Sequence, residues 1–214
     1  MRAMVLLVMM VLLATFVRAE ESRTLFLPAG RAESRLLESA RRHVARGETD
    51  QAMAIFAELI ERQPDFASAI TERAFLREKL GDLAGAKADY ERVLELAPMR
   101  EKSWSHTAWI RALMKADLEE AARRCDRALA ISRSLDAIDS CRFVAFQRGD
   151  YATASALYDE ALRVSPRSDS SRYMRGLTHL RQGQEAEGHA DIAKALKGTP
   201  SLAELWAKRG APAP

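Results

Sequence analysis

Small and bulky residues alternate along this chain with helical spacing, and the pattern recurs at regular intervals. In each recurrence a small residue is followed four positions later by a bulky one, and residues four apart lie on one face of a helix. The pairs are Ala52 and Phe56, Ala86 and Tyr90, Ala121 and Cys125, Ala154 and Tyr158, and Gly188 and Ile192. The pattern predicts an all-α protein.

Prolines and glycines follow the same interval, about 34 residues. The prolines are Pro64, Pro98, Pro166 and Pro200, and Ser132 stands in the one vacant place. The glycines are Gly47, Gly81, Gly149 and Gly183, and here Lys115 stands in the vacant place. Glycine suits the left-handed turn that ends a helix, and proline closes the next helix. Each unit is therefore predicted to be a helix hairpin.

The chain resembles the tetratricopeptide repeat family, whose pattern has a small residue in the first helix, a turn glycine, an alanine and an aromatic in the second helix, and a final proline. The clearest matches are residues 67–98, with Gly81 and Tyr90, and 135–166, with Gly149 and Tyr158. The resemblance implies an all-α, right-handed solenoid of about five helix-turn-helix repeats with a C-terminal capping helix. The repeats would be 33–66, 67–100, 101–134, 135–168 and 169–202.

Two repeats depart from this pattern. In the third, the second helix is displaced by one residue, which indicates an insertion near Lys115 and a shorter connection near Arg133. The fourth carries Arg142 where a small residue is expected, which leaves the register of its first helix open.

The N-terminal segment has the features of a secretory signal peptide over residues 1–19. An apolar run of about 14 residues follows Arg2 and ends at Val17-Arg18-Ala19, a sequence suited to cleavage. The alternative is an uncleaved membrane anchor, for which the run is short, since a spanning helix needs about 20 residues. We expect an exported protein, periplasmic or secreted, with residues 20–32 as a linker. Membrane contact would occur only through an uncleaved signal peptide.

The C-terminal residues 203–214 are predicted to form a capping helix and a frayed tail. Leu202, Leu205 and Trp206 would cover the stacking face of the last repeat, because an end repeat otherwise exposes it. The tail would begin at Gly210.

The charge balance argues against a nucleic-acid partner. The chain has 33 Lys and Arg against 30 Asp and Glu, and loss of residues 1–19 removes Arg2 and Arg18 and no acid. Nucleic-acid binders use a basic excess gathered on one face, since phosphate neutralisation supplies much of their affinity. Pentatricopeptide repeats, which have a similar period and bind RNA, are disfavoured for the same reason.

The resemblance implies a candidate binding surface, because the first helices of such repeats line the concave side. The ninth residue of each repeat would point there, and the five are Arg41, Phe75, Trp109, Phe143 and Leu177. Exposed apolar side chains in such a row mark contact sites. The alternative is that some of them, above all Trp109 and Phe143, pack within the core.

Two cysteines fall on consecutive predicted helices, at Cys125 and Cys141. An oxidising compartment would permit a disulfide between them, and the alternative is two buried free thiols. Four histidines show no metal-ligand spacing, and no catalytic or phosphate-binding motif occurs, so we expect no metal, no cofactor and no enzymatic activity.

These observations favour an exported adaptor or assembly scaffold that binds a protein or peptide, without a small-molecule cofactor. The alternative is a structural subunit of a cell-envelope complex that self-associates or docks through the same surface. A third, weaker alternative is an accessory to a hydrolase that acts only with a partner.

Overall fold

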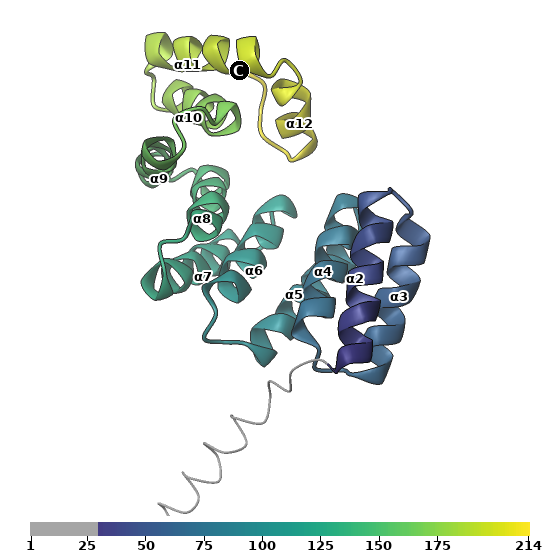
Figure 1. The fold of residues 1–214 in the computed structure, drawn as a ribbon. Helices are drawn as coiled ribbons and strands as arrows, with labels where there is room; N and C mark the ends of the chain where they lie inside the picture. The colour runs from purple at the N-terminus through teal and green to yellow at the C-terminus, as the bar shows by residue number, and fades with distance from the viewer. Residues whose placement is uncertain (1–29) are drawn as a thin grey trace, which may run out of the picture. The chain divides into compact units, whose positions relative to one another are not determined.

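The computed structural model describes residues 30–214, and every regular element in that range is an α-helix. Most of the described helices form antiparallel hairpins with the next helix along the chain (Figure 1). The predicted signal peptide and most of the predicted linker lie outside the described residues. The prediction of an all-helical repeat fold is confirmed.

The chain divides into two compact units, and the boundary follows Leu76. Unit one contains α2 (Arg31–Ala45), α3 (Thr49–Arg62) and the first part of α4 (Ala67–Lys79). Its core is made by side chains of these helices together with Phe66 from the connection before α4. The helix residues include Leu37, Ala40, Ala52, Phe56, Leu59, Ala69 and Leu76. The α2–α3 hairpin turns at Gly47, whose φ of 74° favours glycine.

Unit two runs from residue 77 to residue 214 and has its own core. After the end of α4 it contains the helices α5 (Leu83–Leu96), α6 (Glu101–Leu113), α7 (Leu118–Ile131), α8 (Leu135–Arg148), α9 (Tyr151–Val164), α10 (Asp169–Arg181), α11 (Glu185–Gly198) and α12 (Leu202–Lys208). The pairs α6–α7, α8–α9 and α10–α11 form hairpins, and α8 packs against both helices of the preceding pair.

Asp side chains start several of the second helices. Asp82 accepts a hydrogen bond from the Gly85 amide at 2.9 Å, and Asp150 accepts one from the Thr153 amide at 3.1 Å. Each bond satisfies an amide that has no partner inside the helix. The residue after the turn glycine therefore serves as the helix N-cap.

The third repeat differs from the others as its sequence indicates. Lys115 and Asp117 both have positive φ, 50° and 49°, in the turn between α6 and α7. The connection from α7 to α8 is then shorter by one residue, since only residues 132–134 separate the two helices whereas 97–100 separate α5 from α6. The extra residue in the turn is thus compensated before the fourth repeat begins.

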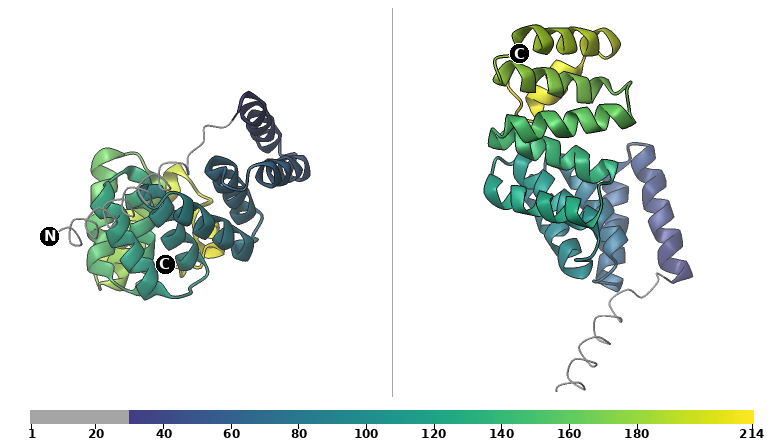
Figure 2. Two further views of the ribbon diagram at one scale, coloured as in Figure 1. Left: turned by 90° about the horizontal axis from the view of Figure 1, so that it is seen from below. Right: turned by 90° about the vertical axis from the view of Figure 1, so that its left-hand side faces the viewer.

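The C-terminal helix turns back toward earlier repeats. Helix α12 contacts α11, as a capping helix should, but it does not extend the stack beyond α11 (Figures 1 and 2). The Trp206 ring instead lies 5.3 Å from the Phe143 ring of α8. The expected frayed tail also begins later, because Ala211 is buried and its amide donates to the Trp206 carbonyl at 2.9 Å.

Candidate binding surface

The ninth-position residues of unit one are accessible. Phe75 is 49% exposed. Arg41 is exposed and pairs with Glu72, its Nη2 atom 2.6 Å from Oε1, and with Glu38 at 3.1 Å. The hydrogen bonds that Arg41 donates to Glu72 raise the pKa of its guanidinium above the ordinary value. Arg41 is therefore held in a surface ion-pair cluster on α2 and α4.

The corresponding residues of unit two are largely covered. Phe143 is 0% exposed and Leu177 is 2% exposed, so both belong to the core. Trp109 is partly buried and packs against the same core. Core packing, the alternative stated for Phe143, is therefore correct in this conformation. For Leu177 the expectation of an open side chain is wrong, because neighbouring side chains of unit two enclose it.

Trp109 of α6 and Phe143 of α8 nevertheless form one feature, with their ring centroids 4.8 Å apart and tilted by 48°. We call these two residues, of which Phe143 is covered by Trp206 of the C-terminal segment, the aromatic surface. The Trp109 Nε1 atom donates to Glu78 Oε1 at 2.8 Å, and Tyr90 donates its hydroxyl to Oε2 of the same carboxylate at 3.2 Å. Glu78 thereby fixes the orientation of the indole.

The C-terminal segment lies on the aromatic surface. Trp206 contacts Phe143, and the Arg209 guanidinium lies 5.4 Å from the centre of the Trp109 ring and 5.0 Å from that of Trp206. Gln147 on α8 donates its side-chain amide to the Arg209 carbonyl at 3.4 Å. The repeat pattern ends before these residues, so the sequence predicts Trp206 only as part of a capping helix and gives no binding role to Arg209.

Arg142 occupies the small-residue position of the fourth repeat and is buried. It donates to Ser171 Oγ at 2.7 Å, pairs with Asp139 at 3.0 Å, and its guanidinium lies 5.0 Å from the centre of the Tyr158 ring. The repeat register therefore continues through α8, and Arg142 is a structural residue there.

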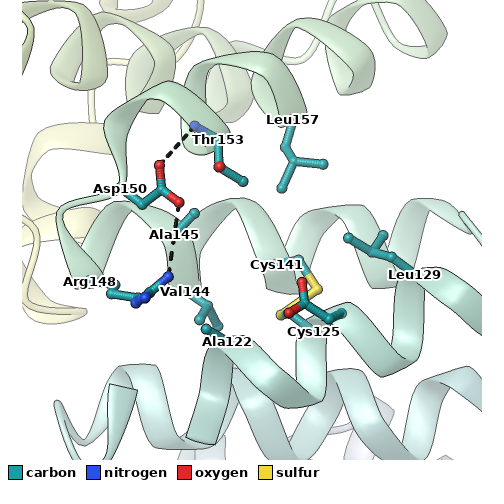
Figure 3. Close-up of a pocket in the computed structure, with 11 residues that line it drawn as sticks. Ala122, Cys125, Leu129, Cys141, Val144, Ala145, Arg148, Asp150, Thr153 and Leu157 are labelled. Atoms are coloured by element: carbon teal, nitrogen blue, oxygen red, sulfur yellow. Dashed lines mark hydrogen bonds and ion pairs between the residues drawn. A yellow bond between two sulfur atoms is a disulfide. The ribbon is translucent and has the colours of Figure 1, made fainter. Parts of the chain in front are cut away.

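Cys125 of α7 and Cys141 of α8 form a disulfide with a Cα–Cα distance of 5.3 Å (Figure 3). The bond borders a pocket of about 110 Å³ that Leu129 and Leu157 also line. Pockets for small organic ligands are typically about 300–1,000 Å³. This pocket is therefore too small to indicate a ligand of that kind.

Neither a metal centre nor a membrane-spanning helix is found within residues 30–214. No group of three or more His, Cys, Asp or Glu side chains in this range could hold an ion. No helix in it is both long enough and apolar enough to cross a bilayer.

Comparison with known proteins identifies the repeats. The tetratricopeptide repeat profile matches residues 37–99 and 144–206, more than half of the chain. Over 154 residues the chain is 27% identical to "DnaJ homolog subfamily C member 3" of Rattus norvegicus, a match that covers 72% of this chain and 27% of that protein. The chain thus spans about a quarter of the length of this relative.

Solved structures give the same fold. The crystal structure of PilW, a type IV pilus biogenesis factor, has a TM-score of 0.70 at 17% identity, with 84% of this chain and 93% of PilW covered. A tetratricopeptide repeat protein from Parabacteroides merdae has a TM-score of 0.66 at 18% identity, with 83% and 74% covered. Proteins of this fold are generally scaffolds for protein–protein interaction and not enzymes. Because the tetratricopeptide repeat profile matches more than half of the sequence, and because the helix pairs and turn glycines agree with it, the chain belongs to the tetratricopeptide repeat family.

Proposed function

We propose that this protein is an exported interaction module that binds a peptide or a protein segment on the aromatic surface of unit two. One observation carries the proposal: Trp109 and Phe143 of successive first helices form a ring pair, and the helix α12 already packs its Trp206 against it. Aromatic residues supply much of the energy of protein interfaces. A surface that accepts one aromatic helix is suited to accept another.

Two further features support export. The residues 1–19 have the composition of a signal peptide, and the Cys125–Cys141 disulfide suits an oxidising compartment. PilW, with the same fold, is named for its part in pilus biogenesis, an assembly process. These features support our proposal that this chain assembles or holds exported proteins. Expression of the full chain in a cell with a secretory pathway, followed by mass measurement, tests export, since a cleaved product should begin at Glu20.

The binding proposal is tested by partner capture with matched tryptophan variants. The tagged chain is cross-linked in its own compartment, and partners of the wild type are compared with those of Trp109→Leu and Trp104→Leu. Both tryptophans lie on α6, but Trp104 donates its indole N–H to the Pro98 carbonyl at 2.8 Å and is outside the aromatic surface. We expect Trp109→Leu to lose a specific partner that Trp104→Leu retains.

Circular dichroism and thermal melting accompany both variants. If Trp109→Leu stays folded and keeps every partner, the aromatic surface is not the binding site. If the wild type recovers only further copies of itself, the envelope-subunit alternative is favoured instead.

A further inference from the structure

The segment from Leu202 to Ala211 is seated on unit two through a small number of fitted contacts. Leu202 and Trp206 are each 3% exposed, and Ala211 is 6% exposed. Trp206 lies against Phe143, and Arg209 lies over both Trp109 and Trp206. The aromatic surface therefore already holds a short helix with a tryptophan and, three residues later, an arginine.

The end of this segment packs closely against the turn of the third repeat. Gly210 has a φ of 81°, a conformation that side chains disfavour, and a Cβ atom there would lie 2.8 Å from Cε of Lys115. Lys115 is itself the residue that replaces the turn glycine of the other repeats. The irregular turn of the third repeat thus lies beside the chain reversal that follows α12.

The packing of α12 on the aromatic surface leaves one buried polar atom without a hydrogen bond. The buried Nε1 atom of Trp206 has no hydrogen-bond partner among residues 30–214. An unsatisfied buried donor opposes burial, and α12 has only seven residues, too few for a helix to be stable alone. The connection through residues 199–201 favours the state in which α12 packs on the aromatic surface, because a short tether gives a high effective concentration.

We propose that residues 202–211 are a resident ligand of the aromatic surface, displaced when a partner presents the same chemistry. The inference rests on the proposed function and specifies its ligand: a helical segment with an aromatic residue and a basic residue three positions later. The ring enters beside Phe143, and the cation stacks on Trp109. A partner whose indole N–H or other donor is satisfied in the complex binds better than the resident segment does.

Competition has a quantitative consequence. A ligand that needs the surface open has its affinity reduced by the fraction of molecules in which α12 is unseated. Variants that unseat α12 should therefore bind an external ligand more tightly, without any new contact to it.

The test uses the full mature chain and a labelled synthetic peptide of residues 199–212. Binding is measured by fluorescence anisotropy for the wild type, for Trp206→Ser and for Gly210→Val, the last of which disturbs the chain reversal and its contact with Lys115 but removes no aromatic or basic side chain. We expect both variants to bind the peptide at least tenfold more tightly than the wild type. A peptide with Trp206→Ala should not bind, and one with Arg209→Ala should bind more weakly.

Several results would overturn the proposal. One is that the folded variants bind the peptide no more tightly than the wild type does. Another is that the Trp206→Ala peptide binds as tightly as the unmodified peptide. A third is that unit two unfolds in both variants, which would make α12 part of the core. The outcome is separable from the partner-capture test. If the peptide fails while a partner still depends on Trp109, only the resident-ligand inference falls. If the peptide binds but no partner depends on Trp109, the surface takes up the α12 segment but partners do not use it, so the proposed function falls together with displacement by a partner.

Discussion

Arg142 shows how a repeat can keep its register while a key position changes. Ala108 and Gly176 hold the same position in the neighbouring repeats of unit two and are buried. Arg142 is buried too, because Ser171 accepts its hydrogen bond and the Tyr158 ring lies against its guanidinium. A buried cation with partners is tolerated, whereas one without them is costly.

Replacing Arg142 with the alanine typical of this position should destabilise the protein. The change removes the bond to Ser171 and leaves a cavity beside Tyr158, so we expect the free energy of unfolding to fall by about 3 kcal/mol. Urea denaturation monitored by circular dichroism measures the change. Arg163→Ala, at an exposed position of α9, is the control and should change stability by less than about 0.5 kcal/mol. A higher free energy of unfolding for Arg142→Ala would show that burying the cation costs more than its contacts contribute.

His106 should make stability depend on pH. Burial beside the Tyr90 ring lowers the pKa of His106, and of the charged groups around it Asp136 and Glu101 oppose this effect while Lys102 adds to it. The folded protein therefore binds this proton less readily than the unfolded chain, whose histidine titrates near about 6.5. Stability from this residue is full above that pH and is lost as the pH falls from there through the lower pKa of the folded protein.

The corresponding experiment compares His106→Gln with the wild type between pH 7 and pH 5. The free energy of unfolding of the variant should decline less over this interval, while its value at pH 7 also reports any loss of packing. His189→Gln, on the exposed side of α11, should follow the wild type. If the pH slopes of all three proteins coincide, His106 does not contribute to acid destabilisation.

Among the elements, the α6–α7 turn departs most from the repeat pattern. Two residues other than glycine, Lys115 and Asp117, have positive φ there, and each such residue costs on the order of 1 kcal/mol. Lys115→Gly restores the usual residue, and we expect the free energy of unfolding to rise by about 1 kcal/mol. Lys87→Gly, within α5, is the control and should lower it by about 1 kcal/mol. Unchanged or reduced stability of Lys115→Gly would mean that the Lys115 side chain contributes more than the turn conformation costs.

The helices and the third-repeat insertion could be predicted from the sequence because both depend on local spacing. The small–bulky pairs set each helix face, and Asp82 and Asp150 mark where second helices begin. The covering of Phe143 could not be predicted in this way. It depends on Trp206, whose position follows from a chain reversal after the repeats end, and no period describes that reversal.

At the scale of the whole molecule, each unit has a separate apolar core. In repeat proteins each repeat is stabilised mainly by its immediate neighbours, so a defect should act locally. Phe56 is 0% exposed in the core of unit one, and Phe56→Ala should cost about 3–5 kcal/mol there. We expect hydrogen exchange to accelerate most in α2 and α3 and least in α10 and α11. Uniform acceleration along the chain would show instead that the array unfolds as one cooperative unit.

The disulfide gives the chain a mechanical limit. Cys125 and Cys141 belong to the third and fourth repeats, which also supply Trp109 and Phe143. If the two ends of the protein are pulled apart, the residues between the cysteines cannot add to the extended length. At about 3.4 Å per residue the released contour is shorter by about 50 Å than in the reduced chain. The repeats that carry the aromatic surface would thus remain tethered to each other under a load that straightens the rest of the array.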